Sequence, residues 1–174
     1  MNRTTFRLGL PLLCAAVLLT GCAGYRMGSV GGKNIQGVST VFVPVTKNTV
    51  LEGGIDVPLT TQIIRTFDQD GTLATAETQA ADSELDVTVT KVDRGMLQYE
   101  RQDVQAANQF EVTLRAQVTF VNRKTGKRIL DNVAVSGKNS YFVQRDQVES
   151  ERQALAMAEQ DLAKNIVSLV VEGW

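Results

Sequence analysis

Few residues in this chain could carry out covalent chemistry. Its 174 residues include no histidine, which excludes Ser-His-Asp and Cys-His nucleophiles and metal sites built on imidazole. Paired carboxylates could act as in glycosidases. The local groups of acids, however, are typical of solvated faces, helix ends and turns: Asp68/Asp70, Asp82/Glu84/Asp86 and Glu149/Glu151. The segment 68–71 resembles the start of a calcium loop but lacks its downstream glutamate. We therefore expect no catalytic residue, no metal site and no cofactor.

Cys22 has the clearest chemistry, because its context predicts acylation of the thiol. Arg3 and Arg7 precede a mostly apolar run over 8–19, which is typical of a secretory signal. The run is shorter than the ~20 residues that a membrane-spanning helix needs. The motif Leu-Thr-Gly-Cys ending at Cys22 resembles a bacterial lipobox, in which the cysteine receives lipid and becomes the first mature residue. We expect a lipoprotein signal peptide over 1–21; the alternative is an ordinary secretory peptide with a chance cysteine.

The second candidate site is a cluster of four basic residues within six positions: Arg123, Lys124, Lys127 and Arg128. Cations at close range favour phosphate groups, arginine through two-pronged hydrogen bonds and lysine as a point charge. The sequence 122–127 is typical of a turn, and side chains on a protruding turn could reach an anionic ligand. The alternative is a solvated turn that discourages edge-to-edge pairing of strands.

The size, charge and cysteine content of the mature chain follow from removal of the predicted signal peptide. Loss of 21 of the 174 residues leaves 153, enough for one domain. Two of the 18 basic residues and none of the 19 acidic ones would leave, which gives a net charge of −3. A mildly acidic chain without long basic runs argues against nucleic acid as a partner. Cys14 would leave with the signal, so no disulfide could form within the chain. The glycine-rich stretch after Cys22 indicates a flexible tether over 22–34 and a single α+β domain over 35–174.

Four strands are predicted from β-branched and alternating residues, at 35–45, 85–90, 110–120 and 128–143. The clearest is 110–120, where apolar and polar residues alternate strictly. In the first strand we expect Val41, Val43 and Val45 on one face, with Pro44 near its end. Gly137 is expected at a bulge or bend in the last strand. The stretch 74–82 is predicted as a connection, and 95–107 is irregular enough that it could extend a strand before looping.

Two amphipathic helices are predicted, because apolar residues recur every three or four positions from Ile55 to Phe67 and again from Glu149 onward. Asp56 is expected to cap the first helix, and Asp146 or Ser150 the second. The resulting order is β-α-β-β-β-α. We predict a two-layer α+β sandwich, with both helices on one face of a mostly antiparallel four-stranded sheet. The side chains of four residues should meet in its core: Ile63, Leu114, Val118 and Leu162.

The whole chain from Leu19 onward resembles the lipopolysaccharide-assembly lipoprotein family, LptE. The resemblance rests on the order and spacing of motifs: the lipobox, Gly24-Tyr25-Arg26, the strand Val41-Phe42-Val43-Pro44 leading by Asn48 to a helix ending at Phe67, the Thr125-Gly126-Lys127 hairpin, and a long alanine-rich C-terminal helix. The irregular stretch 95–107 matches no family motif.

The resemblance implies a partner rather than a reaction. A member of this family would be anchored in the outer membrane by palmitate-type lipid, face the periplasm, and bind and plug the LptD β-barrel to assist lipopolysaccharide assembly. The phosphates of lipopolysaccharide would then be the ligand of the four cations. The alternative is a lipid-anchored periplasmic structural or adaptor domain, such as a secretin pilot or a cell-wall binder.

Overall fold

The computed structural model describes residues 35, 37–77, 80–96, 109–142 and 147–173. The predicted signal peptide and tether, together with Cys22, lie outside these residues. The described elements are β1 (Thr40–Phe42), β2 (Lys47–Asn48), α2 (Asp56–Asp70), β3 (Ala74–Thr75), β4 (Ser83–Met96), β5 (Gln109–Asn122), β6 (Arg128–Phe142) and α3 (Gln147–Glu172). The strands form one six-stranded sheet in the order β3-β1-β4-β5-β6, and β2 pairs with β4.

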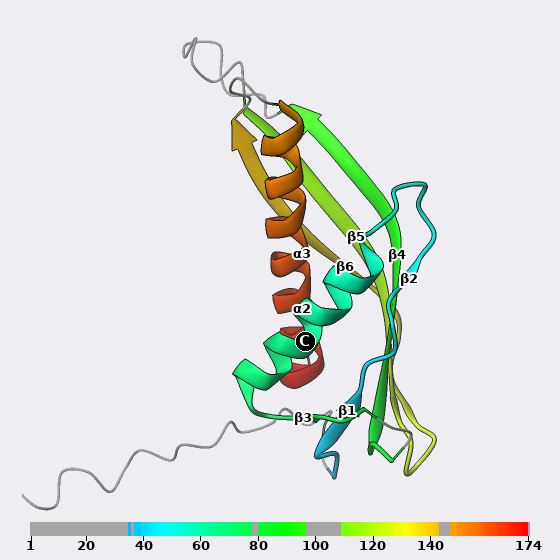
Figure 1. Ribbon diagram of the computed structural model, residues 1–174. Coiled ribbons are helices and arrows are strands. Elements are labelled where there is room, and N and C mark those ends of the chain that lie inside the picture. The colour runs from blue at the N-terminus through cyan, green and yellow to red at the C-terminus, as the bar shows by residue number, and fades with distance from the viewer. Residues whose placement is uncertain (1–34, 36, 78–79, 97–108, 143–146, 174) are drawn as a thin grey trace, which may run out of the picture.

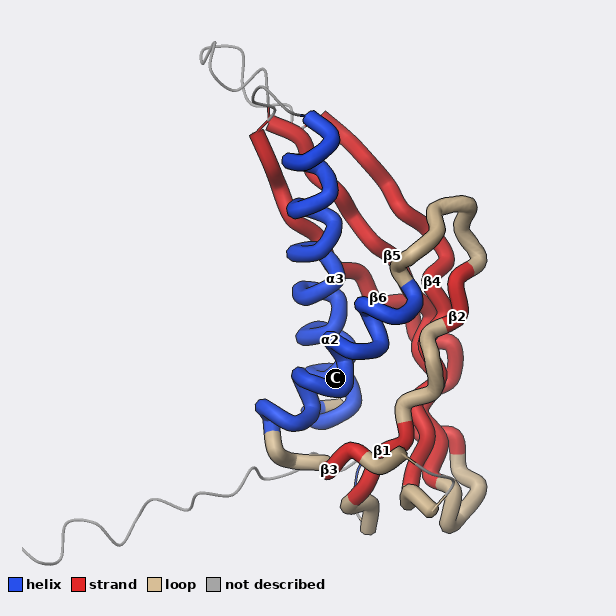
Figure 2. The backbone as a smooth tube through the Cα atoms, in the orientation of Figure 1, coloured by secondary structure: helices blue, strands red, loops and turns tan. Residues whose placement is uncertain are grey.

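The two helices cover one face of this sheet, as predicted (Figures 1 and 2). Helix α3 packs along β6 and β5, and α2 crosses against α3 and β3. The four residues expected in the core, Ile63, Leu114, Val118 and Leu162, are all fully buried in the same apolar cluster. The two-layer α+β arrangement and the alternation of the third predicted strand are therefore confirmed.

The prediction of a mostly antiparallel four-stranded sheet is wrong in its N-terminal part. Strands β4, β5 and β6 pair antiparallel over long stretches, but β1 runs parallel to both β3 and β4, and β2 runs parallel to β4. The reason is the crossover through α2, because a helix that connects two strands on one face of a sheet returns the chain in the same direction. The stretch 74–82, predicted as a connection, supplies β3 from this crossover.

The first predicted strand, 35–45, is also shorter than expected. Its ladder ends at Phe42 and resumes at Lys47, since Pro44 has no N–H to continue it. Val41 and Val43 are buried, as predicted, but Val45 is 61% exposed. By contrast β4 extends to Met96. The first residues of the irregular stretch 95–107 therefore continue a strand, as considered from the sequence, and residues 97–108 lie outside the described residues.

The helix ends agree with the sequence at their C-termini more than at their N-termini. Gly71 adopts a left-handed conformation and donates its N–H to the carbonyl of Phe67 at 2.9 Å, a C-cap that glycine favours. The N-cap of α2 is Ile55, without a side-chain hydrogen bond, so the prediction of Asp56 as the cap is wrong. Asp56 is the first helical residue and still lies at the positive end of the helix. Ser150 lies inside α3, and Asp146 lies outside the described residues.

Gly137 was expected at a bulge or bend, and the structure shows no bulge there. It pairs regularly with Leu114, and the register shifts of the β5–β6 pair lie closer to the turn, between Val118 and Val121. A Cβ atom on Gly137 would lie 2.2 Å from the backbone nitrogen of Leu162 and 2.5 Å from its Cα. The residue is therefore glycine because the backbone of α3 passes directly over β6 at this point.

Two features limit the free backbone at the edges of the sheet. At the β6 edge, Asp161 of α3 accepts a hydrogen bond from the N–H of Lys138 at 2.9 Å. Asn165 of the same helix donates to the carbonyl of Ser136 at 2.9 Å. At the opposite edge β3 is only two residues long.

The face of the sheet that points away from the helices is polar. Leu85, Val87 and Val89 of β4 point into the core. The residues that alternate with them along β4 therefore point outward, and so do the residues of β5 that are paired with those. The outward residues of the central strands are mostly hydroxyl, amide and charged: Asp86, Thr88, Asp93, Thr113, Arg115, Gln117, Thr119 and Lys138. Ion pairs join some of these across strands, including Arg115 with Asp93 at 3.2 Å.

Candidate functional site

The predicted cation cluster lies at the tip of the β5–β6 hairpin. The turn is closed by a hydrogen bond from Asn122 N–H to the carbonyl of Lys127 at 2.9 Å, and Gly126 takes the positive φ of 69° that this turn requires. The tip lies at the same end of the sheet as the start of β1 (Figure 1). The structure therefore brings the four cations together at one end of the domain.

Arg123 is held by an acid and an aromatic ring rather than projecting freely. Its guanidinium donates two hydrogen bonds to Glu84, at 3.1 and 2.9 Å, and lies 5.1 Å from the centre of the Phe42 ring. Only 23% of its side chain is exposed. These contacts connect the hairpin to β4 and β1, because Glu84 and Phe42 are register partners there.

Lys124 pairs with Asp82 at 2.7 Å. The same carboxylate accepts the N–H of Ser39 at 2.8 Å, and the backbone carbonyl of Asp82 accepts the N–H of Arg123 at 2.8 Å. Lys124 and the Ser39 N–H together lower the pKa of Asp82 to about 2, because both favour the charged form. Asp82 thus connects the start of the domain at Ser39 to the hairpin tip at Arg123 and Lys124.

The remaining two cations differ from each other. Arg128 pairs with Asp131 at 2.9 Å, whereas Lys127 forms no ion pair with any described residue. Three acids, Asp82, Glu84 and Asp131, therefore offset three of the four cations. The assignment of Arg123, Lys124, Lys127 and Arg128 to an anionic ligand remains a prediction, and Lys127 has the charge most available to it.

We predict that Lys127→Gln combined with Arg128→Gln lowers affinity for lipopolysaccharide several-fold, and that the remaining binding depends less on salt. These side chains are exposed, so the variant should keep its fold. The measurement is lipopolysaccharide binding between low and high ionic strength, with circular dichroism as the check on folding. Lys91→Gln combined with Arg115→Gln is the matched control on the outward sheet face. Equal loss in both variants, or affinity insensitive to salt in the parent, would contradict a site at the tip.

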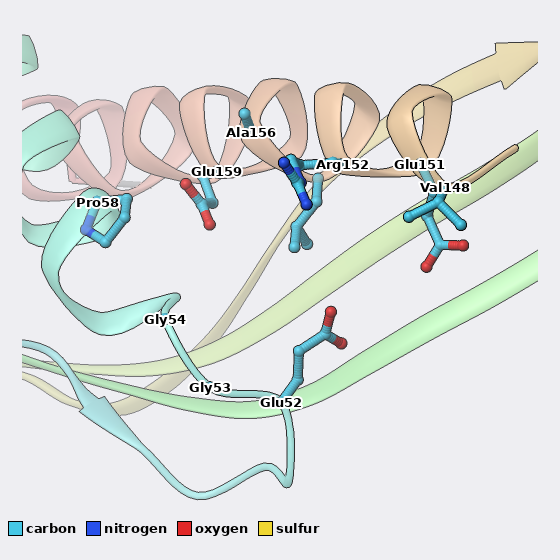
Figure 3. Close-up of a pocket in the computed structure, with 10 residues that line it drawn as sticks. Glu52, Gly53, Gly54, Pro58, Val148, Glu151, Arg152, Ala156 and Glu159 are labelled. Atoms are coloured by element: carbon cyan, nitrogen blue, oxygen red, sulfur yellow. The ribbon is translucent and has the colours of Figure 1, made fainter. Parts of the chain in front are cut away.

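A groove that the sequence did not predict runs between the N-terminal half of α3 and the loop before α2 (Figure 3). Its volume is about 510 Å³, and it is lined by Glu52, Gly53, Gly54, Pro58, Val148, Glu151, Arg152, Leu155, Ala156 and Glu159. Arg94 of β4 holds one end of this groove. It donates to both oxygens of Glu52, at 2.7 and 2.6 Å, and also to Glu151. The loop and the helix are thereby fixed on either side of the opening.

Glu159 lines this groove, and its exposure is unusually low for a glutamate. It is only 7% exposed, and no hydrogen bond or ion pair joins its carboxyl group to another described residue. Burial raises its pKa to about 7, since removal from water disfavours the carboxylate. A signal for this was present in the sequence: Leu155, Glu159, Leu162 and Ile166 follow the helical spacing of the buried face.

Within the described ranges, no three His, Cys, Asp or Glu side chains are grouped so that they could hold a metal ion. None of the described helices is both long enough and apolar enough to cross a membrane.

Comparison with known proteins identifies a family model that matches this chain and solved structures that share its fold. A family model described as LptE: Lipopolysaccharide-assembly matches residues 38–170. No curated protein sequence matches the chain. Among solved structures, the hypothetical protein CT253 from Chlamydia trachomatis is 10% identical with a TM-score of 0.54, covering 76% of this chain and 95% of its own.

Two other solved structures are similar to a comparable extent. Protein XCC0632 from Xanthomonas campestris is 11% identical, with a TM-score of 0.52 and coverage of 75% of this chain and 82% of its own. An uncharacterized lipoprotein B from Nitrosomonas europaea is 8% identical, with a TM-score of 0.50 and coverage of 84% and 85%. At such low identity these similarities describe the fold alone.

Proposed function

Because this chain belongs to the lipopolysaccharide-assembly family LptE, we propose that it binds and plugs an LptD-type β-barrel and assists lipopolysaccharide assembly at the outer membrane. The observation that carries this proposal is the family match over residues 38–170, which spans nearly all of the described domain. The family comprises assembly lipoproteins and not enzymes, so the expected action is binding.

The outward face of the sheet supports a contact with the barrel interior. The lumen of an outer-membrane barrel is polar, and a domain that fills it needs side chains that can exchange hydrogen bonds with water and with the barrel wall. Thr88, Gln117, Thr113 and Arg115 present such groups on the side away from the helices. We propose that this outward face is one of the surfaces that meet the barrel.

The test is co-purification from detergent-solubilised outer membrane, with the retained proteins identified by mass spectrometry. We expect the LptD-type barrel to be retained in near-equal amount to this chain. Retention of a secretin or of cell wall without the barrel would contradict the proposal and support the adaptor alternative.

Anchoring is proposed through a covalent lipid on Cys22, with Ala23 at the position where family members carry the sorting signal. We predict that Cys22→Ser abolishes processing and lipidation, so the protein stays uncleaved or becomes soluble. Several acyl chains anchor a protein stably, whereas a single chain binds only marginally. The measurement is fractionation of membranes with mass determination of the N-terminal peptide, with Cys14→Ser as the matched control. A Cys22→Ser protein that is still processed and found in the outer membrane would contradict a lipid on this cysteine.

A further inference from the structure

The groove beside α3 contains a carboxyl group of unusually low exposure. Glu159 is almost fully buried, and no described residue pairs with it. Burial of a carboxylate without a partner is costly, and other residues of α3 at its level are apolar or small, such as Leu155 and Ala163. Arg152 also lines the groove, but its side chain is 76% exposed and pairs with Glu149 at 3.8 Å.

Apolar side chains make up part of the lining beside Glu159. They come from Pro58 of α2, which Figure 3 shows next to Glu159, and from Leu155 and Ala156 of α3. Glu52 and Glu151 add two further carboxylates, which share a single cation, Arg94. The groove therefore combines apolar surface with three carboxyl groups and two guanidinium groups, which leaves an excess of acidic over basic side chains.

The lining of the groove also includes an exposed apolar side chain, Val148. Val148 is 70% exposed. Exposed apolar surface at a concave site is typical of a protein-binding surface. A free small amine would leave this side chain in water, so its exposure favours a protein as the occupant.

We propose that this groove receives a lysine or arginine side chain of the barrel partner, with its charged head at Glu159 and its aliphatic stem between Pro58 and Leu155. Long basic side chains bury their stems along apolar surface while the head finds a charged partner. In an interface that excludes water, removal of one member of a charge pair strongly weakens binding, because the other charge is left buried without a partner. The identity of the partner rests on the proposed function; the chemistry of the groove does not.

The first experiment tests the groove alone. The full domain is titrated with Nα-acetyl-L-lysine methylamide while the backbone amide shifts of Leu155 and Ala156 are followed by NMR, and the neutral norleucine analogue serves as the matched ligand. We expect saturable shifts with the lysine probe, at least tenfold weaker binding in Glu159→Gln, and no change in Glu172→Gln, an exposed glutamate on the same helix. Equal shifts with the norleucine analogue, or unchanged binding in Glu159→Gln, would overturn the proposal.

The second experiment uses the complex with the barrel. Co-purified complexes of the parent, Glu159→Lys, Glu159→Gln and Glu172→Lys are washed with rising salt, and the retained barrel is quantified. We expect several-fold less barrel with Glu159→Lys, an intermediate loss with Glu159→Gln and none with Glu172→Lys; circular dichroism confirms that each variant is folded. If the parent and both Glu159 variants retain equal barrel, the inference is wrong and the proposed function stands. If the parent retains no barrel, the proposed function fails, and the lysine titration still decides whether the groove accepts a basic side chain.

Discussion

Gly137→Ala should destabilise this domain by about 3–5 kcal/mol, above the usual cost of overpacking. The added Cβ would lie 2.2 Å from the nitrogen of Leu162 and 2.5 Å from its Cα. These are backbone atoms of α3, so no side-chain rotation can relieve the clash. The helix would have to move away from β6, and the contacts of Leu162 and Ala158 with the sheet would loosen together.

The measurement is urea unfolding, supported by a thermal midpoint that we expect to fall by roughly 10 °C or more. Gly95→Ala is the matched control, because Gly95 also lies in a long strand but has nothing within 4 Å of its Cβ position. That variant should change the free energy of unfolding by about 0.5 kcal/mol or less. Similar effects of the two substitutions would show that α3 does not pass as close to β6 as described.

Glu159→Gln should stabilise the domain in mildly alkaline solution and remove much of its pH dependence. Burial raises the pKa of Glu159 from 4.5 to about 7. Between these values the folded protein holds a proton that the unfolded chain has lost, so the free energy of unfolding falls as pH rises through this window. By pH 8 the loss is nearly complete and amounts to about 3 kcal/mol. Glutamine carries no charge at any of these pH values and is free of this cost.

The comparison is urea unfolding of the parent and Glu159→Gln at pH 5 and pH 8. We expect near-equal stability at pH 5 and a gain of about 2–3 kcal/mol for the variant at pH 8. Glu172→Gln should follow the parent at both values. The other charged side chains along the groove, Glu52, Glu151 and Arg152, are unchanged in all three proteins. A parent whose stability does not fall between pH 5 and pH 8 would contradict the burial of Glu159.

The sequence predicted those parts of the fold that depend on local pattern. Strict alternation identified β5, because one face of that strand packs on the helices and the other meets water. Helical spacing identified α2, and Gly71 marked its end. The parallel pairing of β1 with β3 and β4 was not predicted, since two- and three-residue strands carry too little pattern and their partners lie more than 30 residues away.

The same distinction applies to the sites. Sequence alone grouped Arg123 and Lys124 as cations at a turn, and it treated Asp82 and Glu84 as solvated acids. The structure pairs these residues across about 40 positions of chain, which no local spacing could reveal. Glu159 was missed for a different reason. Its helical position pointed to the core, but only the tertiary arrangement shows that none of the basic side chains in the described ranges pairs with it.

The blunted edges of the sheet have a consequence for how copies of this protein behave side by side. A lipid anchor, as proposed for Cys22, would confine neighbouring copies to a plane and raise their effective concentration. An open strand edge under such crowding would template the addition of further strands. Asp161 and Asn165 occupy backbone groups of β6, and β3 is too short to offer a second template. A second copy that added a strand along the middle of β6 would first have to displace these two contacts with α3, which disfavours the fusion of crowded copies into one continuous sheet at this point.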